Sequence, residues 1–148
     1  MEKLAKKFKH GRCIAAPQGY AILPVSIGEF EEELDALDIE HSEARSELPV
    51  PTSFSRHLIH EVANASRGAS LAIIETDYFG GAGGQGAGVL AGGEWVMPWT
   101  WSSTDDQPQP EIGPISRALM DLGVHRHGSF DEFEALELGQ YRDFADFE

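Results

Sequence analysis

The stretch from Leu71 to Trp101 decides the fold: it reads LAIIETDYF at 71–79, GGAGGQGAG at 80–88 and VLAGGEWVMPWTW at 89–101. It holds half of the sixteen glycines and all three tryptophans of the chain. The segment 71–79 is short, rich in β-branched and aromatic residues, and followed by glycine, which favours a strand over a helix. Because both of its faces begin apolar, we predict that the first half of the strand is buried on both sides, as in a central strand.

The carboxylates Glu75 and Asp77 fall on one face of this predicted strand, because side chains two residues apart point the same way. They are expected to lie roughly 7 Å apart, at about 3.3 Å of rise per residue. Such a pair can perform acid–base chemistry or bind a cation. The simpler interpretation is structural: the two carboxylates leave the core at the end of the strand and bond local backbone donors or an arginine.

A tight hairpin is predicted at Ala91–Glu94, because Gly-Gly supplies the positive φ angles of a two-residue turn. The strand that follows, 94–101, places Trp95, Met97, Trp99 and Trp101 on a single face by strict alternation. Since Pro98 cannot donate to a ladder, we expect an edge strand whose pairing fails there. Trp95 is then a core residue, and Trp99 and Trp101 are more exposed. The alternative for the whole stripe is an aromatic binding platform.

The glycine-rich segment contains a formal G-x-G-x-x-G at 81–86. A dinucleotide site requires a helix directly after this motif, whereas here another strand follows. There is no Lys-Ser/Thr pair either, which excludes a P-loop. We therefore interpret the glycines as a wide connection or bulge that a neighbouring backbone or side chain approaches closely.

The chain of 148 residues has a formal net charge of −14, and its charges are unevenly distributed. Residues 1–12 carry five basic side chains and one acidic one, whereas residues 13–148 carry six arginines against twenty-four carboxylates. Such a body repels nucleic acid and anionic membranes, and its charge suits a basic protein partner or serves solubility alone. The single cysteine, Cys13, permits no internal disulfide framework, and no apolar run approaches the length of a membrane span. We expect a cytoplasmic protein.

Helices are expected to pack beside the sheet. A capping box at Ser26–Glu29 opens one whose outer face is acidic, and a second follows Thr52 or Ser53. A third starts at Gly113-Pro114 and stops at Gly123, and a capping box at Ser129–Glu132 opens a short fourth with Phe130 and Phe133 inward. The fold class is α+β: a mostly antiparallel sheet centred on residues 71–101, with three or four short helices. Residues 13–148 form one domain after a basic segment, 1–12, which is a flexible tail or a short helix.

Other constellations carry little chemistry. His57, His60 and Glu61 form H-x-x-H-E rather than the H-E-x-x-H of zinc proteases, and no third ligand is indicated. His125 and His127 are expected to be exposed. There is no G-x-S-x-G elbow for nucleophilic catalysis. For the leading hypothesis we predict no catalytic residue, no cofactor and no metal.

Four segments carry a resemblance: Tyr20–Val25, ETDYFGG at 75–81 with Gln85, ISRAL through LGV at 115–124, and LGQYR at 138–142. They resemble a group of small, uncharacterised bacterial proteins, and the chain also looks like the acidic immunity proteins that accompany secreted bacterial toxins. The resemblance implies an inhibitor that binds one toxin in the cytoplasm, and it supplies no catalytic residue. The basic segment 1–12 is not part of this pattern.

The leading hypothesis is therefore a non-enzymatic, acidic protein-binding module, an immunity protein that neutralises a basic toxin such as a nuclease. The residues expected to contact the partner are acidic or aromatic: Glu31, Glu32, Glu33, Asp35, Glu75, Asp77, Trp99, Trp101, Asp105 and Asp106. The alternative is a small hydrolase or ligand-binding protein that uses Glu75, Asp77 and Gln85 near the glycine-rich loop.

Overall fold

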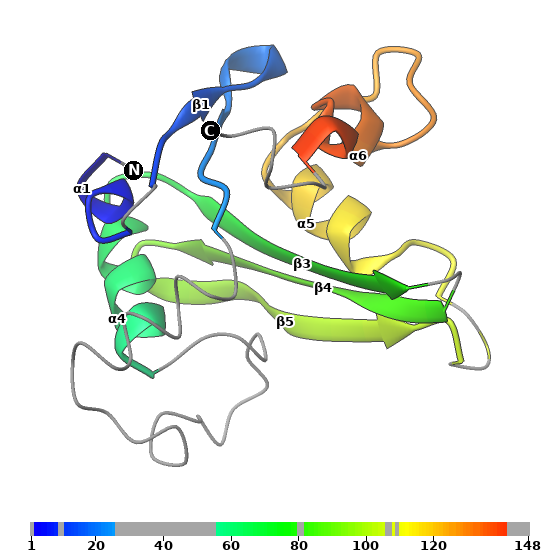
Figure 1. Ribbon diagram of the computed structural model, residues 1–148, viewed down its shortest axis with the longest axis horizontal. Coiled ribbons are helices and arrows are strands. Elements are labelled where there is room, and N and C mark those ends of the chain that lie inside the picture. Colours follow the sequence, from blue (N-terminus) through cyan, green and yellow to red (C-terminus); the bar gives the residue numbers. More distant parts are fainter. Residues whose placement is uncertain are drawn as a thin grey trace.

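The computed structural model describes residues 2–8, 11–25, 56–79, 82–105, 108 and 110–141. Over these residues the architecture is α+β, as predicted, with a two-stranded and a three-stranded antiparallel sheet and four α-helices (Figure 1). The helices and 3-10 turns are α1 (Glu2–Ala5), η1 (Pro17–Gly19), α4 (Arg56–Ala65), α5 (Pro114–Asp121), α6 (Glu132–Ala135) and η2 (Leu138–Tyr141). The strands are β1 (Ile14–Ala15), β2 (Ala21–Ile22), β3 (Leu71–Phe79), β4 (Ala82–Ala91) and β5 (Glu94–Ser103).

The larger sheet has the order β3-β4-β5. The predicted strand 71–79 is confirmed, but its predicted central position is wrong: β4 is the middle strand and β3 flanks it. The glycine-rich segment, from Ala82 onward, is therefore a strand rather than a wide connection. Glycine is weak in a strand by itself, so β4 depends on its two neighbours and on what packs over it.

Two hydrophobic clusters cover the two faces of this sheet. On one face, Leu58 and Val62 of α4 pack with Ile73, Leu90 and Trp99, and Leu4 and Phe8 from the N-terminal segment join them. On the other face, Ile115, Ala118 and Leu119 of α5 pack on Ala87 and Val89. Figure 1 shows α5 and α6 on one side of the sheet and α4 and α1 together at its end. The helices predicted after Thr52 or Ser53 and from Gly113 to Gly123 are thus confirmed, as α4 and α5, where the structure describes them.

The predicted hairpin is confirmed at the β4–β5 turn. Ala91 pairs with Glu94, and Gly92 and Gly93 have φ angles of 64° and 94°. The end of α4 is bonded to this turn, because the amides of Gly92 and Gly93 donate to the backbone oxygen and the hydroxyl of Ser66 at 3.0 Å. The turn therefore ties α4 to the sheet.

Strand β5 departs from simple alternation. Its pairing with β4 shifts between Val89 and Leu90 and again between Ala87 and Val89, so β5 holds an extra residue at each irregularity. The shifts turn Met97 to the α5 side, away from Trp95 and Trp99, which corrects the predicted four-residue stripe. The ladder also does not fail at Pro98 but continues to Ser103. As a result Trp99, rather than Trp95, is the most buried tryptophan, at 7 % exposure.

The N-terminal segment takes the helical one of its two predicted forms, and the start of α6 corrects one expectation. The N-terminal segment is helical at α1 and packs on α4, where the Lys7 ammonium lies 3.2 Å from the Glu61 carboxylate. At α6 the N-cap is Asp131 rather than Ser129, because its carboxylate accepts from the amide of Glu134 at 2.8 Å. Phe130 consequently points outward with 84 % exposure, whereas Phe133 packs in the core as predicted. The acidic helix predicted after Ser26 lies outside the described residues.

None of the helices among the described residues is long and apolar enough to cross a membrane.

Candidate functional site

The face of the sheet that carries Trp95, Trp99 and Trp101, here called the tryptophan face, also carries both predicted carboxylates. Cross-strand partners share a face, and the register aligns Glu75 with Gly86 and Trp101 in one row. Asp77, Gly84 and Ser103 form the next row toward the end of the sheet. The middle position of each row is glycine, so no side chain of β4 separates the carboxylates on β3 from the indole on β5.

The indole of Trp101 occupies the space that a side chain on β4 would need. A Cβ built on Gly84 would stand 2.6 Å from Cζ2 of Trp101, and one built on Gly86 would stand 2.8 Å from its Cε3. One ring therefore covers two glycines. Because the atoms in contact lie along the six-membered ring, the indole leans across β4 toward β3, with the glycine backbone as its support. The close approach predicted for the glycines is confirmed in this form.

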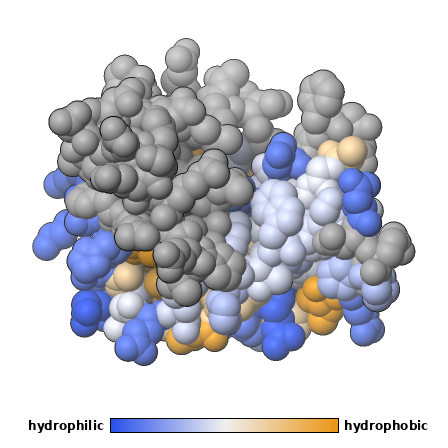
Figure 2. All heavy atoms as spheres, turned by 90° about the horizontal axis from the view of Figure 1, so that it is seen from below, coloured by the Kyte–Doolittle hydropathy of each residue, from blue (hydrophilic) through white to orange (hydrophobic). Residues whose placement is uncertain are grey.

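The tryptophan face has a closed end and an open end. At the closed end Trp99 and Ile73 belong to the core beneath α4 and are 7 % and 8 % exposed. At the open end Trp101 is 40 % exposed, Asp77 is exposed and Glu75 is half-buried. Figure 2 views the molecule from the side opposite α5 and shows pale residues of intermediate hydropathy beside the atoms drawn in grey.

The open end has the chemistry of a cation site for a protein side chain. An indole face attracts an ammonium or guanidinium group through its quadrupole, and tryptophan is the best of the aromatic residues for this contact. Two strand spacings separate β3 from β5, which is about 10 Å, so a group above the ring lies within reach of the carboxylates. Asp105, also exposed, follows the end of β5, where its amide donates to the Ser103 hydroxyl at 3.2 Å.

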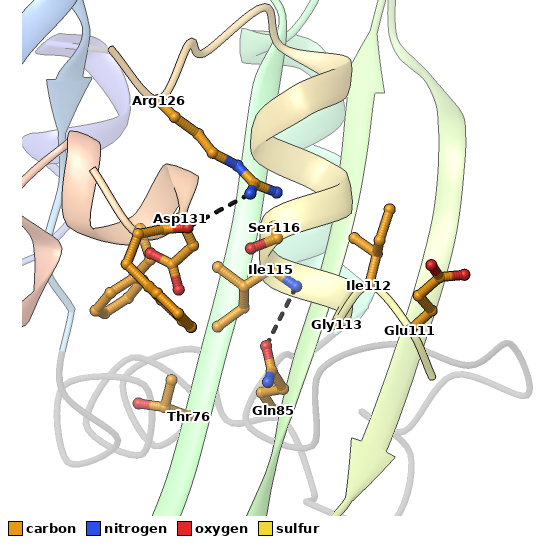
Figure 3. A pocket seen from close by; sticks show the side chains of 11 residues that line it. Thr76, Gln85, Glu111, Ile112, Gly113, Ile115, Ser116, Arg126 and Asp131 are labelled. Atoms are coloured by element: carbon orange, nitrogen blue, oxygen red, sulfur yellow. Dashed lines mark hydrogen bonds between the residues drawn. The ribbon is translucent and has the colours of Figure 1, made fainter. Parts of the chain in front are cut away.

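Gln85 lies on the opposite face, because it pairs with Thr76 and not with a carboxylate. There it lines an open pocket of about 620 Å³ between the start of α5, the loop before α6 and the sheet (Figure 3). Its Oε1 accepts from the amide of Ile115 at 3.4 Å and thereby satisfies one of the free donors at the start of α5. The structure therefore brings Glu75 and Asp77 together, as predicted, but separates both from Gln85.

An ion pair beside this pocket was not predicted. Arg126 donates from Nε to Oε1 of Glu132 at 2.7 Å, and Glu132 is 3 % exposed. Burial pushes the pKa of Glu132 upward, but the hydrogen bond and the charge of Arg126 help to outweigh it, so the pKa lies below its ordinary value. The pair therefore stabilises the fold when the pH is above the ordinary pKa of a glutamate. This stabilisation is lost as the pH falls through the lowered pKa of Glu132. The two residues are six apart across a turn, and no spacing rule for helices or strands detects them.

The other predicted residues are placed as follows. Glu31, Glu32, Glu33, Asp35 and Asp106 lie outside the described residues. No group of three His, Cys, Asp or Glu side chains that could hold a metal ion occurs in the described part of the chain. His125 and His127 are exposed, as expected, and their rings meet edge to face with the ring centroids 5.7 Å apart.

Comparisons with protein-family models, with curated proteins and with solved structures found no match to this chain. The α+β architecture and the geometry of the tryptophan face are therefore the basis for a functional proposal.

Proposed function

We propose that this protein is an acidic protein-binding module that takes a basic protein partner, in the way that an immunity protein neutralises its cognate bacterial toxin, such as a nuclease, in the cytoplasm. The observation that carries the proposal is the open end of the tryptophan face. There Trp101 rests on Gly84 and Gly86, is 40 % exposed, and lies across the sheet from Asp77 and Glu75. No catalytic step is part of this function.

The energetics suit such a partner. A cation over an exposed indole is worth about 0.5–1 kcal/mol, rising to about 2 kcal/mol when the contact is desolvated, as it is at the centre of an interface. Tryptophan is also among the residues that most often dominate binding energy. The net charge of −14 adds long-range attraction, which accelerates the encounter with a basic protein and weakens with salt.

The alternative function, a small hydrolase or ligand-binding protein, needs Glu75, Asp77 and Gln85 in one pocket. The register places Gln85 on the opposite face from the two carboxylates, and neither carboxylate lines the pocket that Gln85 shares with Thr76. This geometry favours the binding module over the alternative.

The experiment starts from the neighbouring genes, because an adjacent toxin reading frame supplies the partner, whereas a metabolic operon counts against the proposal. Trp101→Ala should weaken binding of that toxin at least tenfold, measured by calorimetry at low and at physiological salt. Val96→Ala is the matched control, since Val96 is on the same strand and 61 % exposed but is apolar and aliphatic. Equal affinity of wild type and Trp101→Ala would reject the platform.

A further inference from the structure

The two outer edges of the larger sheet are built differently. Strand β5 is continuous but contains Pro98 and two register shifts in its pairing with β4, and both devices discourage another chain from pairing with an edge. On β3 the pairing with β4 runs without a shift through nine consecutive partners, from Leu71–Leu90 to Phe79–Ala82. β3 contains neither proline nor glycine. One edge is protected and the other is regular.

The regular edge is also unpaired within the part of the chain that the structure describes. In that part, β3 has β4 as its partner on one side and no strand on the other. A strand at the edge of a sheet presents alternate N–H and C=O groups outward, which form a template for an added strand. β3 has nine residues, more than the usual five or six of a strand, and its second half carries Glu75 and Asp77.

The charge on β3 identifies what fits this edge. Asp77 and Glu75 stand two residues apart on the tryptophan face, so an added strand would place every second side chain directly beside them. Opposite charges in such cross-strand pairs are stabilising and like charges are destabilising. A second copy of this chain would bring another net charge of −14 against the first, and its own β3 would offer carboxylates to carboxylates. The favoured occupant is therefore an extended basic segment.

We propose that the outer edge of β3 receives an extended segment of the basic partner as an added strand, with lysine or arginine at alternate positions facing Asp77 and Glu75. This inference rests on the proposed function and specifies how the partner is held. Backbone hydrogen bonds to the edge supply the alignment, and the alternate basic side chains supply the selection. The basic side chains of the added strand that lie nearest the open end of the sheet are then on the same face as the Trp101 indole.

The test uses a nine-residue capped peptide that alternates lysine with valine, together with two derivatives N-methylated on alternate amides, one on the odd positions and one on the even positions. Only one set of amides faces β3 in the added strand, so one derivative should lose at least tenfold in affinity while the other binds like the parent. Fluorescence anisotropy of labelled peptides at low salt measures this. The two derivatives carry similar numbers of N-methyl groups, five and four, so each controls for the general effect of N-methylation on the other.

Variants of the protein locate the site. Asp77→Asn should weaken binding of the parent peptide several-fold. Glu94→Gln, which changes an exposed carboxylate on β5, should leave this affinity unchanged. Equal binding of all three peptides would overturn the added strand while leaving Trp101 and the charge attraction of the proposed function intact. Absence of binding by the parent peptide, or dimerisation of the protein in sedimentation experiments, would also overturn it. Loss of toxin binding in Trp101→Ala tests the proposed function independently.

Discussion

The closed and open ends of the tryptophan face contain the same residue types, tryptophan over glycine, but one end is core and the other is surface. At both ends a tryptophan of β5 lies over glycine of β4: the ring of Trp95 covers Gly88, the ring of Trp99 covers Gly86, and the ring of Trp101 covers Gly84 and Gly86. At the closed end α4 completes the burial, and the neighbours on β3 are Leu71 and Ile73. At the open end the neighbours on β3 are Glu75 and Asp77. The composition of β3 therefore decides which indole is core and which is surface.

The largest effect should come from removing the indole at the closed end. Trp99→Ala is expected to cost roughly 3–5 kcal/mol in free energy of unfolding, as for a large aromatic removed from a core. Trp101→Ala should cost clearly less, because 40 % of that residue is already in contact with solvent. Urea unfolding of both variants measures the difference. Equal costs would mean that the two ends are not distinct.

A second experiment adds a methyl group beneath each ring. Gly86→Ala places a Cβ against the ring of buried Trp99 as well as Trp101, and overpacking of this kind typically costs about 1–3 kcal/mol. A Cβ on Gly84 meets the exposed ring of Trp101, which can move outward, and the backbone oxygen of Ser102 at 2.7 Å, which can move only with β5. Because the buried Trp99 ring is not among the nearest atoms, Gly84→Ala should destabilise less than Gly86→Ala in thermal unfolding, yet weaken partner binding more than its stability loss explains. A Gly84→Ala variant with unchanged affinity would show that the support of the ring is unimportant.

The smallest effect on stability is expected at Asp77, because the residue is exposed. Asp77→Asn should change the free energy of unfolding by no more than about 0.5 kcal/mol, as for most surface substitutions. Divalent ions should not raise the melting temperature, since no cluster of three ligands lies among the described residues. A calcium- or magnesium-dependent rise in wild type that is absent from Asp77→Asn would instead favour the ligand-binding alternative.

Local patterns in the sequence predicted much of this fold. The strand at 71–79, the Gly92-Gly93 hairpin and the helices at α4 and α5 follow from periodicity, capping and turn chemistry, which are short-range. The central position of β4 was missed because its glycines read as a connection, and nothing local reports that three indoles from β5 cover them. The position of Met97 was missed for a related reason, since each bulge reverses the alternation and leaves no mark in composition.

The candidate site was predictable in part. Period-two spacing correctly placed Glu75 and Asp77 on one face, and the exposure of Trp101 agrees with the expected platform. The burial of Trp99 was not anticipated, because Pro98 does not end the ladder. Gln85 was grouped with the carboxylates by its proximity in sequence, although a difference of one position in a strand changes the face. The Arg126–Glu132 pair depends on tertiary burial, which no local pattern encodes.

The glycines of β4 affect how the pairing register of this strand with β3 and β5 is specified during folding. Gly84, Gly86 and Gly88 recur every two residues, so sliding β4 by two positions would again place glycine under part of the row of rings and Ala82 or Leu90 under the rest. On this face the register is therefore only weakly specified, as is general for glycine-rich strands. The information that distinguishes them must reside elsewhere: in Ala87 and Val89, which fit under α5 in one alignment, and in the Gly92-Gly93 turn that Ser66 fastens to α4. The alignment of the face that we propose as the binding surface is thus specified mainly by contacts on the opposite side of the sheet and at the turn.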